Sequence, residues 1–488
     1  MFDAFQYLLT PTPLALVALG VTLGIVVGAI PGLSGAMLIA LSLPLTFDME
    51  PANALTLLVS MYVGAVSGGL ITATLLRMPG TPASIMTTLD GYPMAKSGHP
   101  GRALGLGICA SFVGGLVSWL FLLLLAKPAA ELSTRFGFFE FFTLVLMALV
   151  LIAAVSGDSL LKGSLAGFLG MLASMPGTSP ATGELRLTLG FSAMNSGFQL
   201  LPVLIGLFAV NQLLREILNL RATVERIRPN RSGLFLTLAQ WKNHSANLLR
   251  SSVIGTWVGI LPGIGANIGS VMAYTAAKSL SKKPEEFGKG SEEGIVASES
   301  ANNATVCGAL IPLIAMGIPG SVIDAVLLGA LVIHEIQPGP LLFEHNPEVA
   351  HTVIGAALCA NIYMFVFMLL AAGSISRLAV IRRPFLIPVV LTFCVIGSFA
   401  LANRMFDVWV MLAFGLAGFG LERARIPLAP FVIGFVLAPI AEKNLLAGLM
   451  ASGGSYGPMV TRPVSLLFLL ISIALLVWPI LRRSVKPR

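Results

Sequence analysis

Runs of apolar residues that are long enough to cross a membrane recur from one end of the chain to the other. Examples are Leu104–Ala126, Phe138–Ala154, Val353–Ala372, Pro384–Ala402 and Val464–Leu481. A helix needs about 20 residues to cross a hydrocarbon core, and each run reaches or nearly reaches that length. Charged residues make up 11% of the chain, against about 25% in a soluble domain. The sequence therefore predicts an all-α, polytopic membrane protein.

The polar residue types argue against several other functions. The net charge of +8 is typical of cationic cytoplasmic loops in a membrane protein, so it is no reason to expect nucleic-acid binding. The four Cys and five His occur at no metal-like spacing, and no metal site is predicted. The first 76 residues contain no Lys or Arg, so we expect no cleavable signal peptide there.

Two Pro-Gly dipeptides inside these apolar runs recur later in the chain, in the same order. Pro31-Gly32 in "GAIPGLSG" recurs 231 residues later as Pro262-Gly263 in "GILPGIG", and Pro79-Gly80 recurs 240 residues later as Pro319-Gly320. A longer charged loop in the second copy accounts for the different offsets. The spacing predicts an internal duplication. Further matches at the second offset are Ser60 with Ser300, Gly68 with Gly308 and Thr81 with Ser321.

Loop charges indicate how the two copies are oriented. The first copy has an acidic loop at Phe47–Asn53 and a basic loop at Lys96–Arg102. The second copy reverses this order, with Lys residues over Lys278–Lys289 and no Lys or Arg over Glu335–His351. By the positive-inside rule the copies are inverted relative to each other. Inverted repeats with broken helices are typical of secondary transporters.

The same charges predict the organisation of the chain. We expect a first transmembrane repeat with auxiliary helices over residues 1–214 and a cytoplasmic basic linker over residues 215–244. A second, inverted repeat with auxiliary helices covers residues 245–481, and a cytoplasmic tail covers residues 482–488. The N-terminus is expected outside. The stretch "GAIPGLSG" is expected to form the tip of a re-entrant hairpin, because both of its flanks fall on one side.

The helix breaks predict the kind of ligand. Unpaired backbone groups in hydrocarbon cost several kcal/mol each, so a break needs protein, water or a ligand to satisfy it. A half-helix that starts at Thr81 or Ser321 would direct its N-terminal amides at an anion such as a carboxylate. Carbonyls near Met78 and Gly317 would be available to a cation such as Na⁺. The alternative is a pair of proline kinks that neighbouring helices satisfy.

Polar residues near the second break add candidates. The stretch "SESANNA" contains Asn302 and Asn303, whose amides suit both carboxylate and Na⁺. The alternative is that this stretch caps a helix. Arg77 precedes the first break and Asp324 follows the second, and ionisable groups at membrane depth are functional candidates. Alternatively, Arg77 and Asp324 form a structural ion pair.

Several long stretches resemble the large membrane subunit of the tripartite tricarboxylate transporters, the TctA family. The resemblance covers residues 20–465 or so and is carried by "GAIPGLSG", "MPGTPASIMTTLDGYPMAKSGHPGRAL", "RLTLGFSAMNSGFQLLPVLIGLFAVNQLL", "SESANNATVCGALIPLIAMGIPGS", "LLGALVIHEIQPGPLLFEHNPEV" and "PLAPFVIGFVLAPIAEKNLLAGLMASGG". Two features depart from the family's pattern. Ser67 stands where the family has a Tyr, and Arg77 and Asp324 replace apolar or hydroxyl residues.

The resemblance implies a permease subunit of the bacterial inner membrane that imports a di- or tricarboxylate or a related organic anion by symport with Na⁺ or H⁺. A periplasmic solute-binding protein would deliver the substrate, and a small four-helix membrane subunit would complete the complex; a dimer is left open. No cofactor is expected besides the coupling cation. The candidate substrate-binding residues are Arg77, Pro79, Gly80, Thr81, Asn302, Asn303, Pro319, Gly320 and Ser321. The candidate cation-binding residues are Gly32, Gly263, Ser300 and Asp324.

Two other classes of function fit the sequence less well. A stand-alone anion channel or uniporter is the alternative reading, but the chain has no ring-forming acidic or carbonyl filter motif. An intramembrane enzyme needs a nucleophile and base or paired aspartates at depth, whereas Asp90, Asp158 and Asp324 fall in unrelated contexts. No "GxxxxGK[ST]" phosphate loop is present, which agrees with uptake that is independent of ATP.

Overall fold

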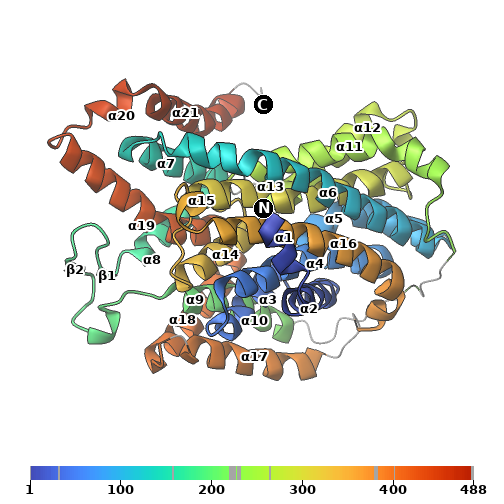
Figure 1. The fold of residues 1–488 in the computed structure, drawn as a ribbon, viewed down its shortest axis with the longest axis horizontal. Coiled ribbons are helices and arrows are strands. Elements are labelled where there is room, and N and C mark those ends of the chain that lie inside the picture. The colour runs from blue at the N-terminus through green and yellow to red at the C-terminus, as the bar shows by residue number, and fades with distance from the viewer. Residues whose placement is uncertain are drawn as a thin grey trace.

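The computed structural model describes residues 2–30, 33–155, 159–218, 227, 232–262, 265–378, 383–400 and 402–484. These residues are almost entirely helical (Figure 1), as the sequence predicts. Within them the only strands are β1 (Gly177–Thr178) and β2 (Leu185–Arg186), which pair antiparallel in a short ribbon at one edge of the molecule. The prediction of an all-α membrane protein is confirmed.

Seven helical stretches of the described chain are long and apolar enough to cross a membrane. They are α2 (Pro11–Gly28), α4 (Pro51–Leu76), α6 (Pro100–Ser133), α9 (Leu200–Leu204) continuing through η4 (Ile205–Val210) and α10 (Asn211–Leu218), α16 (Pro347–Leu378), α18 (Met405–Arg423) and α19 (Leu428–Ala451). The sequence-predicted runs at Leu104 and Val353 lie in α6 and α16. The other three lie in shorter apolar helices, namely α7 (Phe138–Val155), α17 (Arg383–Ala400) and α21 (Pro463–Ser484).

The remaining elements are short or follow the breaks. They are α1 (Phe2–Leu8), α3 (Gly35–Ser42), η1 (Leu43–Thr46), η2 (Pro82–Ser84), α5 (Ile85–Lys96), α8 (Leu160–Ser174), η3 (Ser192–Met194), α11 (Leu238–Ile260), α12 (Gly265–Leu280), η5 (Pro284–Glu286), α13 (Glu292–Met316), α14 (Val322–Ile333), α15 (Leu342–His345) and α20 (Gly457–Thr461). Helix α11 begins inside the stretch 215–244 that we expected to form the linker. Most of the linker's arginines, and residues 485–488 of the tail, lie outside the described residues.

Each Pro-Gly position separates two helices, so the predicted broken helices are confirmed. The first break lies between α2 and α3, and its counterpart in the second copy lies between α11 and α12. Of these positions, Pro31, Gly32 and Gly263 are outside the described residues. The other two breaks separate α4 from α5 and α13 from α14. We call the break at Arg77–Ser84 the first central break and the break at Gly317–Ser321 the second central break.

Glycines hold the helices of each copy together through matched contacts. At these glycines an added Cβ would meet a backbone carbonyl of the partner helix, so only glycine permits such close approach. The contacts repeat at the offsets of 231 and 240 residues that the sequence shows. They pair Gly24 with Met61 and Gly255 with Ala301, Gly28 with Ala65 and Gly259 with Thr305, Gly68 with Ile25 and Gly308 with Thr256, and Gly80 with Gly28 and Gly320 with Gly259. Such agreement is what an internal duplication predicts. The opposite membrane orientation of the copies stays a prediction.

The two copies meet at the centre of the molecule, where α4 and α13 pack together (Figure 1). Both helices are buried along almost their whole length. Half-helix α5 packs against α13, and half-helix α14 packs against α3 and α4, so each lies against the other copy. Outside this core, α7 and α8 pack against α19, and η4 packs against α18. Auxiliary helices from the two halves of the chain therefore pack against each other.

Candidate functional site

Ser321 begins the half-helix of the second central break. It is the N-cap residue of α14, and its hydroxyl accepts a hydrogen bond from the backbone N–H of Asp324 at 3.3 Å. The same hydroxyl lies 3.2 Å from the hydroxyl of Tyr62 on α4. Pro319 and Gly320 are buried just before it. The half-helix predicted at Ser321 is therefore present, and its N-terminus is tied to the helix of the other copy.

Asp324 lies in the first turn of α14 and is completely buried. Neither carboxylate oxygen has a hydrogen-bond partner within the described residues, although the Tyr62 and Ser321 hydroxyls lie close by. Arg77 does not pair with it: the guanidinium is exposed and lies 5.7 Å from the ring centre of Tyr92. The predicted alternative of an Arg77–Asp324 ion pair is therefore wrong. A buried carboxylate without a cationic partner is costly, and it requires a proton or another cation.

The first central break differs from the prediction of a half-helix that starts at Thr81. A 3₁₀ turn, η2, intervenes, and α5 begins at Ile85. Ser84 explains this turn, because its hydroxyl accepts from the Thr81 N–H at 3.3 Å and donates to the Thr81 carbonyl at 2.8 Å. The Thr81 hydroxyl is buried and has no hydrogen-bond partner there. Gly80 packs tightly on Gly28, whereas Pro79 is exposed.

Asn302 and Asn303 lie in the middle of α13 and have different surroundings. Both polar atoms of the Asn303 side chain are hydrogen-bonded: its Oδ1 accepts from the Ser67 hydroxyl at 2.6 Å, and its Nδ2 donates to the Glu299 carbonyl at 3.2 Å. Asn302 donates to the carbonyl of Val66 at 3.4 Å, but its Oδ1 has no partner. The capping alternative is wrong, because Ser291 caps this helix. Ser67 of α4 ties the two central helices together through this bond.

Serine hydroxyls without partners lie on both central helices. Ser60 on α4 and Ser300 on α13 are buried, and neither hydroxyl has a hydrogen-bond partner within the described residues. The two positions are related by the offset of 240 residues. Each central helix therefore carries a spare serine hydroxyl at the equivalent position, and Ser300 keeps the free oxygen that a cation site needs.

More of the carbonyl groups at the helix ends accept hydrogen bonds than the sequence predicts. Arg77 and Gly317 end α4 and α13 in the left-handed conformation, with φ of 54° and 71°. Beyond them, the N–H of Met78 donates to the Thr72 carbonyl at 3.3 Å and that of Ile318 to the Pro312 carbonyl at 3.2 Å. This closing pattern satisfies carbonyls of the last turn. The predicted cation site at the carbonyls therefore has fewer free oxygens than expected.

Polar side chains from both central breaks and from α13 contact one stripe of α4. Ser321 contacts Tyr62, Asn302 contacts Val66, and the Thr81 hydroxyl packs on Gly69. Positions 62, 66 and 69 are spaced by four and three residues, so they share one helix face and span about 10 Å along the axis. Both central breaks and the asparagine of α13 therefore approach one short stretch of α4.

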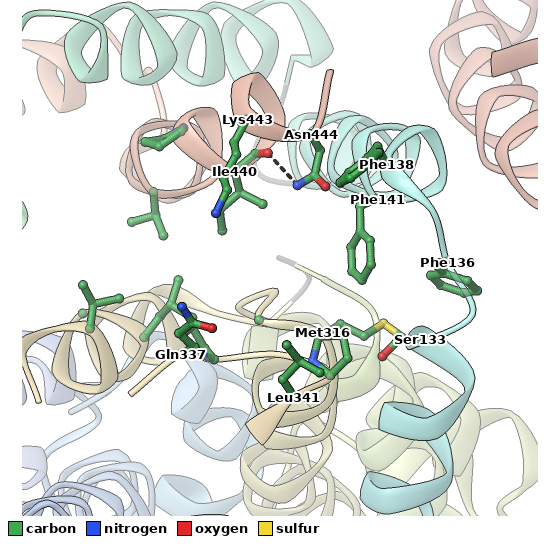
Figure 2. Close-up of a pocket in the computed structure, with 18 of the residues that line it drawn as sticks. Ser133, Phe136, Phe138, Phe141, Met316, Gln337, Leu341, Ile440, Lys443 and Asn444 are labelled. Carbon is green, nitrogen blue, oxygen red and sulfur yellow. Dashed lines mark hydrogen bonds between the residues drawn. The ribbon is translucent and has the colours of Figure 1, made fainter. Parts of the chain in front are cut away.

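A cavity of about 780 Å³ reaches the second central break (Figure 2). Met316 and Gly317, where α13 ends, form part of its lining. Lys443 of α19 and Gln337 point into it from opposite sides. Among the residues that line it, Lys443 is the one cationic side chain, and phenylalanines supply much of the remaining surface. Sequence reasoning missed Lys443, whose only signal was its place in the stretch "APIAEKNLL".

The comparisons with known proteins give the family. The family model described as the tripartite tricarboxylate transporter TctA family matches residues 14–433. A protein of Agrobacterium vitis, described as an uncharacterised 52.8 kDa protein in the TAR-I ttuC' 3' region, is 32% identical over 97% of this chain and 94% of its own length. A second, described as an uncharacterised protein in the TAR-II ttuC' 3' region, is 34% identical over 43% of this chain and 87% of its own. No solved structure matches.

The family match covers the central helices, all four breaks and most of the auxiliary helices. Together with the spanning helices, it makes the chain a multi-pass membrane protein and a component of a transporter that has partner subunits. The chain belongs to the tripartite tricarboxylate transporter TctA family.

Proposed function

We propose that this chain is the permease subunit of a tripartite importer that takes up a di- or tricarboxylate, or a related organic anion, across the bacterial inner membrane. A periplasmic solute-binding protein would deliver the substrate, and a small four-helix membrane subunit would complete the complex. Family membership supports this assignment. The structural observation that carries it is the set of buried, unpartnered polar groups where both central breaks approach α4.

The anion is proposed to bind at this stripe of α4. Thr81 and Ser321 supply hydroxyl donors, and the first turn of α14 adds N–H groups and a partial positive charge. The amide of Asn302 offers a further contact once the substrate displaces its weak bond of 3.4 Å to Val66. Arg77 and Pro79 are exposed beside the break, so their contribution would be to the entrance.

Asp324 explains why uptake would require a cation. Its unpaired carboxylate stands at the same helix N-terminus as the proposed anion site. Two negative charges this close repel each other strongly in a low-dielectric core. A Na⁺ or H⁺ bound at Asp324, with Ser300 as a further candidate oxygen, removes that repulsion. Cation and substrate then raise each other's affinity, because such coupling is reciprocal.

The cavity is proposed as the route from the outside to the second central break. It lies against the loop after α14, which carries no Lys or Arg and is therefore predicted to face outward. Lys443 in its wall would attract an anion released by the binding protein. From the end of α13, which the cavity reaches, the carboxylate would then pass the second central break to the stripe of α4.

Reconstitution tests the proposal. The chain, its small membrane subunit and the substrate-loaded binding protein are placed in proteoliposomes, and accumulation of radiolabelled succinate and citrate is followed under Na⁺ and pH gradients. We expect gradient-dependent accumulation that requires the binding protein. Passive flux that does not saturate would favour a stand-alone channel or uniporter. Full rates from this chain alone would contradict the tripartite assignment.

A further inference from the structure

We propose that Glu299 is a proton-binding group of the transport cycle, so that at least one coupling cation is H⁺. This inference rests on the proposed function and deepens it. Glu299 belongs to the stretch "SESANNA" but is not among the site residues that the sequence predicts. It lies one turn before Asn302 and Asn303 on α13, and its side chain is 0% exposed.

Hydroxyl groups are the hydrogen-bond partners of the Glu299 side chain. Its Oε1 accepts from the Thr87 hydroxyl of α5 at 2.5 Å, and its Oε2 accepts from the Ser111 hydroxyl of α6 at 3.1 Å. The Thr87 hydroxyl also lies 3.0 Å from the Ser298 hydroxyl. The carboxylate therefore joins α13 to the half-helix that follows the first central break.

No cation neutralises Glu299, and no ion pair involves it in the part of the chain that the structure describes. Several charged groups on the helices packed against α13 bind other partners, and Lys96, Lys242 and Lys278 are exposed. His244 and Arg102 bind Glu292, and Asp90 accepts from the N–H groups of Gly288, Gly290 and Ser291. Arg250 contacts Asn247, Lys127 contacts Glu131, and Asp324 is itself unpaired. The neutral dipoles of these hydroxyls and of the nearby Asn302 amide do not by themselves offset a fully buried negative charge.

The geometry favours a proton over a metal cation. Both carboxylate oxygens are already in direct hydrogen-bond contact with hydroxyl oxygens. A Na⁺ ion would have to separate these oxygens in order to coordinate them, whereas a proton requires no added volume. The step is a simple one: the carboxylate and one proton from the outer solution form a neutral carboxyl group, which releases the proton to the cytoplasm.

Protonation of Glu299 would also change the hydrogen bond that holds α5 against α13. In the ionised state Thr87 donates to Glu299 through a charge-assisted bond, which is stronger than a neutral one. In the neutral state the Thr87 hydroxyl is free to turn to Ser298, 3.0 Å away. The proton thereby weakens the contact between α5 and α13 and couples the charge of Glu299 to the first central break.

The test compares Glu299→Gln with a matched control in the reconstituted tripartite complex. Glutamine resembles the protonated side chain but cannot release a proton. We expect the inward proton gradient to accelerate uptake of the better of succinate and citrate in the wild type but not in Glu299→Gln. Exchange of internal for external substrate, which needs no net proton movement, should survive within about twofold. Glu293→Gln, on the same helix but partly exposed, should keep the wild-type response to the gradient.

A second variant and a spectroscopic measurement keep the inference testable if Glu299→Gln folds poorly. Thr87→Val removes a donor that stabilises the ionised form, so the midpoint of the pH profile of uptake should rise by about one unit. Infrared difference spectra of the full chain between high and low pH should show a protonated carboxyl band that Glu299→Gln lacks.

Two results would overturn the inference. One is unaltered proton-driven uptake in Glu299→Gln, and the other is loss of a Na⁺-driven component alone. A wild-type complex that accumulates neither anion under any gradient would instead refute the proposed function, so the two failures are distinguishable.

Discussion

The first and second central breaks share one backbone framework but place different chemistry inside it. In both, a glycine after the proline packs on the carbonyl of the matching glycine of α2 or α11, and a left-handed residue ends the long helix. At equivalent positions, however, Ser84 of the first break becomes Asp324 in the second. Ser84 hydrogen-bonds the backbone N–H and carbonyl of Thr81, whereas Asp324 is buried with two free carboxylate oxygens.

The two central breaks therefore share a backbone scaffold, and the different residues at positions 84 and 324 make their chemistry unequal. A transporter with two identical breaks would have two equivalent sites. Here the acidic group occurs at one break only, next to the cavity that reaches the end of α13. The second break is therefore the proposed cation site, and the first break supplies neutral donors to the anion.

The largest expected effect comes from exchanging the chemistry at these equivalent positions. Asp324→Asn should lower gradient-driven uptake by about 100-fold, because a charged contact contributes about 1.5–3 kcal/mol and 1.4 kcal/mol is tenfold. Ser84→Ala should lower it by about fivefold or less. Initial rates in proteoliposomes measure both. Equal losses would mean that the two breaks do the same task.

Glycine substitutions probe the shared scaffold. A Cβ at position 80 collides with the rigid carbonyl of Gly28, whereas one at position 320 meets the Ala309 methyl at 2.8 Å and the Gly259 oxygen at 2.9 Å. We expect Gly80→Ala to destabilise the chain by about 3 kcal/mol and Gly320→Ala by about 1 kcal/mol. Thermal unfolding of the solubilised protein reports the difference. Identical losses would show that the first break is no more tightly packed.

Substituting the two asparagines separately tests which one binds the anion and which one stabilises the packing of α4 against α13. Asn302→Ala should raise the KM for the anion by about tenfold with little change in stability, since one hydrogen bond to a charged ligand is removed. Asn303→Ala should instead destabilise the protein by about 1–2 kcal/mol, and Ser67→Ala should reproduce part of that loss, because it removes one of the two hydrogen bonds of Asn303. A rise in KM for Asn303→Ala alone would reverse these assignments.

The smallest effect is expected at the cavity. Lys443→Ala should raise KM by about threefold at low salt, and the difference should shrink as salt screens the charge. Lys127→Ala is the control, because Lys127 is an exposed lysine of α6 that pairs with Glu131. KM values measured between low and high salt test this. A salt-independent effect would mean that Lys443 acts through packing.

The breaks were predictable because they rest on local chemistry. At the four paired positions a Pro-Gly dipeptide interrupts an apolar helix, whereas Pro128 and Pro312, which no glycine follows, lie inside α6 and α13. The spacing of the Pro-Gly pairs gave the offsets at which the glycine contacts recur. Ser321 was predictable as a helix start because serine is a favoured N-cap. Thr81 was misjudged, because the Ser84 hydroxyl stabilises a 3₁₀ turn before α5.

The rest of the site depends on tertiary packing, which the sequence does not display. The Arg77–Asp324 alternative was wrong because the left-handed turn at Arg77 directs its side chain to Tyr92. Lys443 lies more than 100 residues from the break whose cavity it lines. Glu299 and Asn303 sit in one short motif, yet only the neighbouring helices decide that one is partnered by hydroxyls and the other by Ser67.

The most direct test of the central claim is the cation dependence of anion binding. Affinity of the purified chain for citrate and succinate is measured by calorimetry across a range of Na⁺ concentration and pH, in the wild type and in Asp324→Asn. We predict that the wild type binds the anion more tightly as the cation rises, and that Asp324→Asn loses most of this dependence. The same cation dependence in both proteins would contradict the claim that anion and cation meet at the second central break.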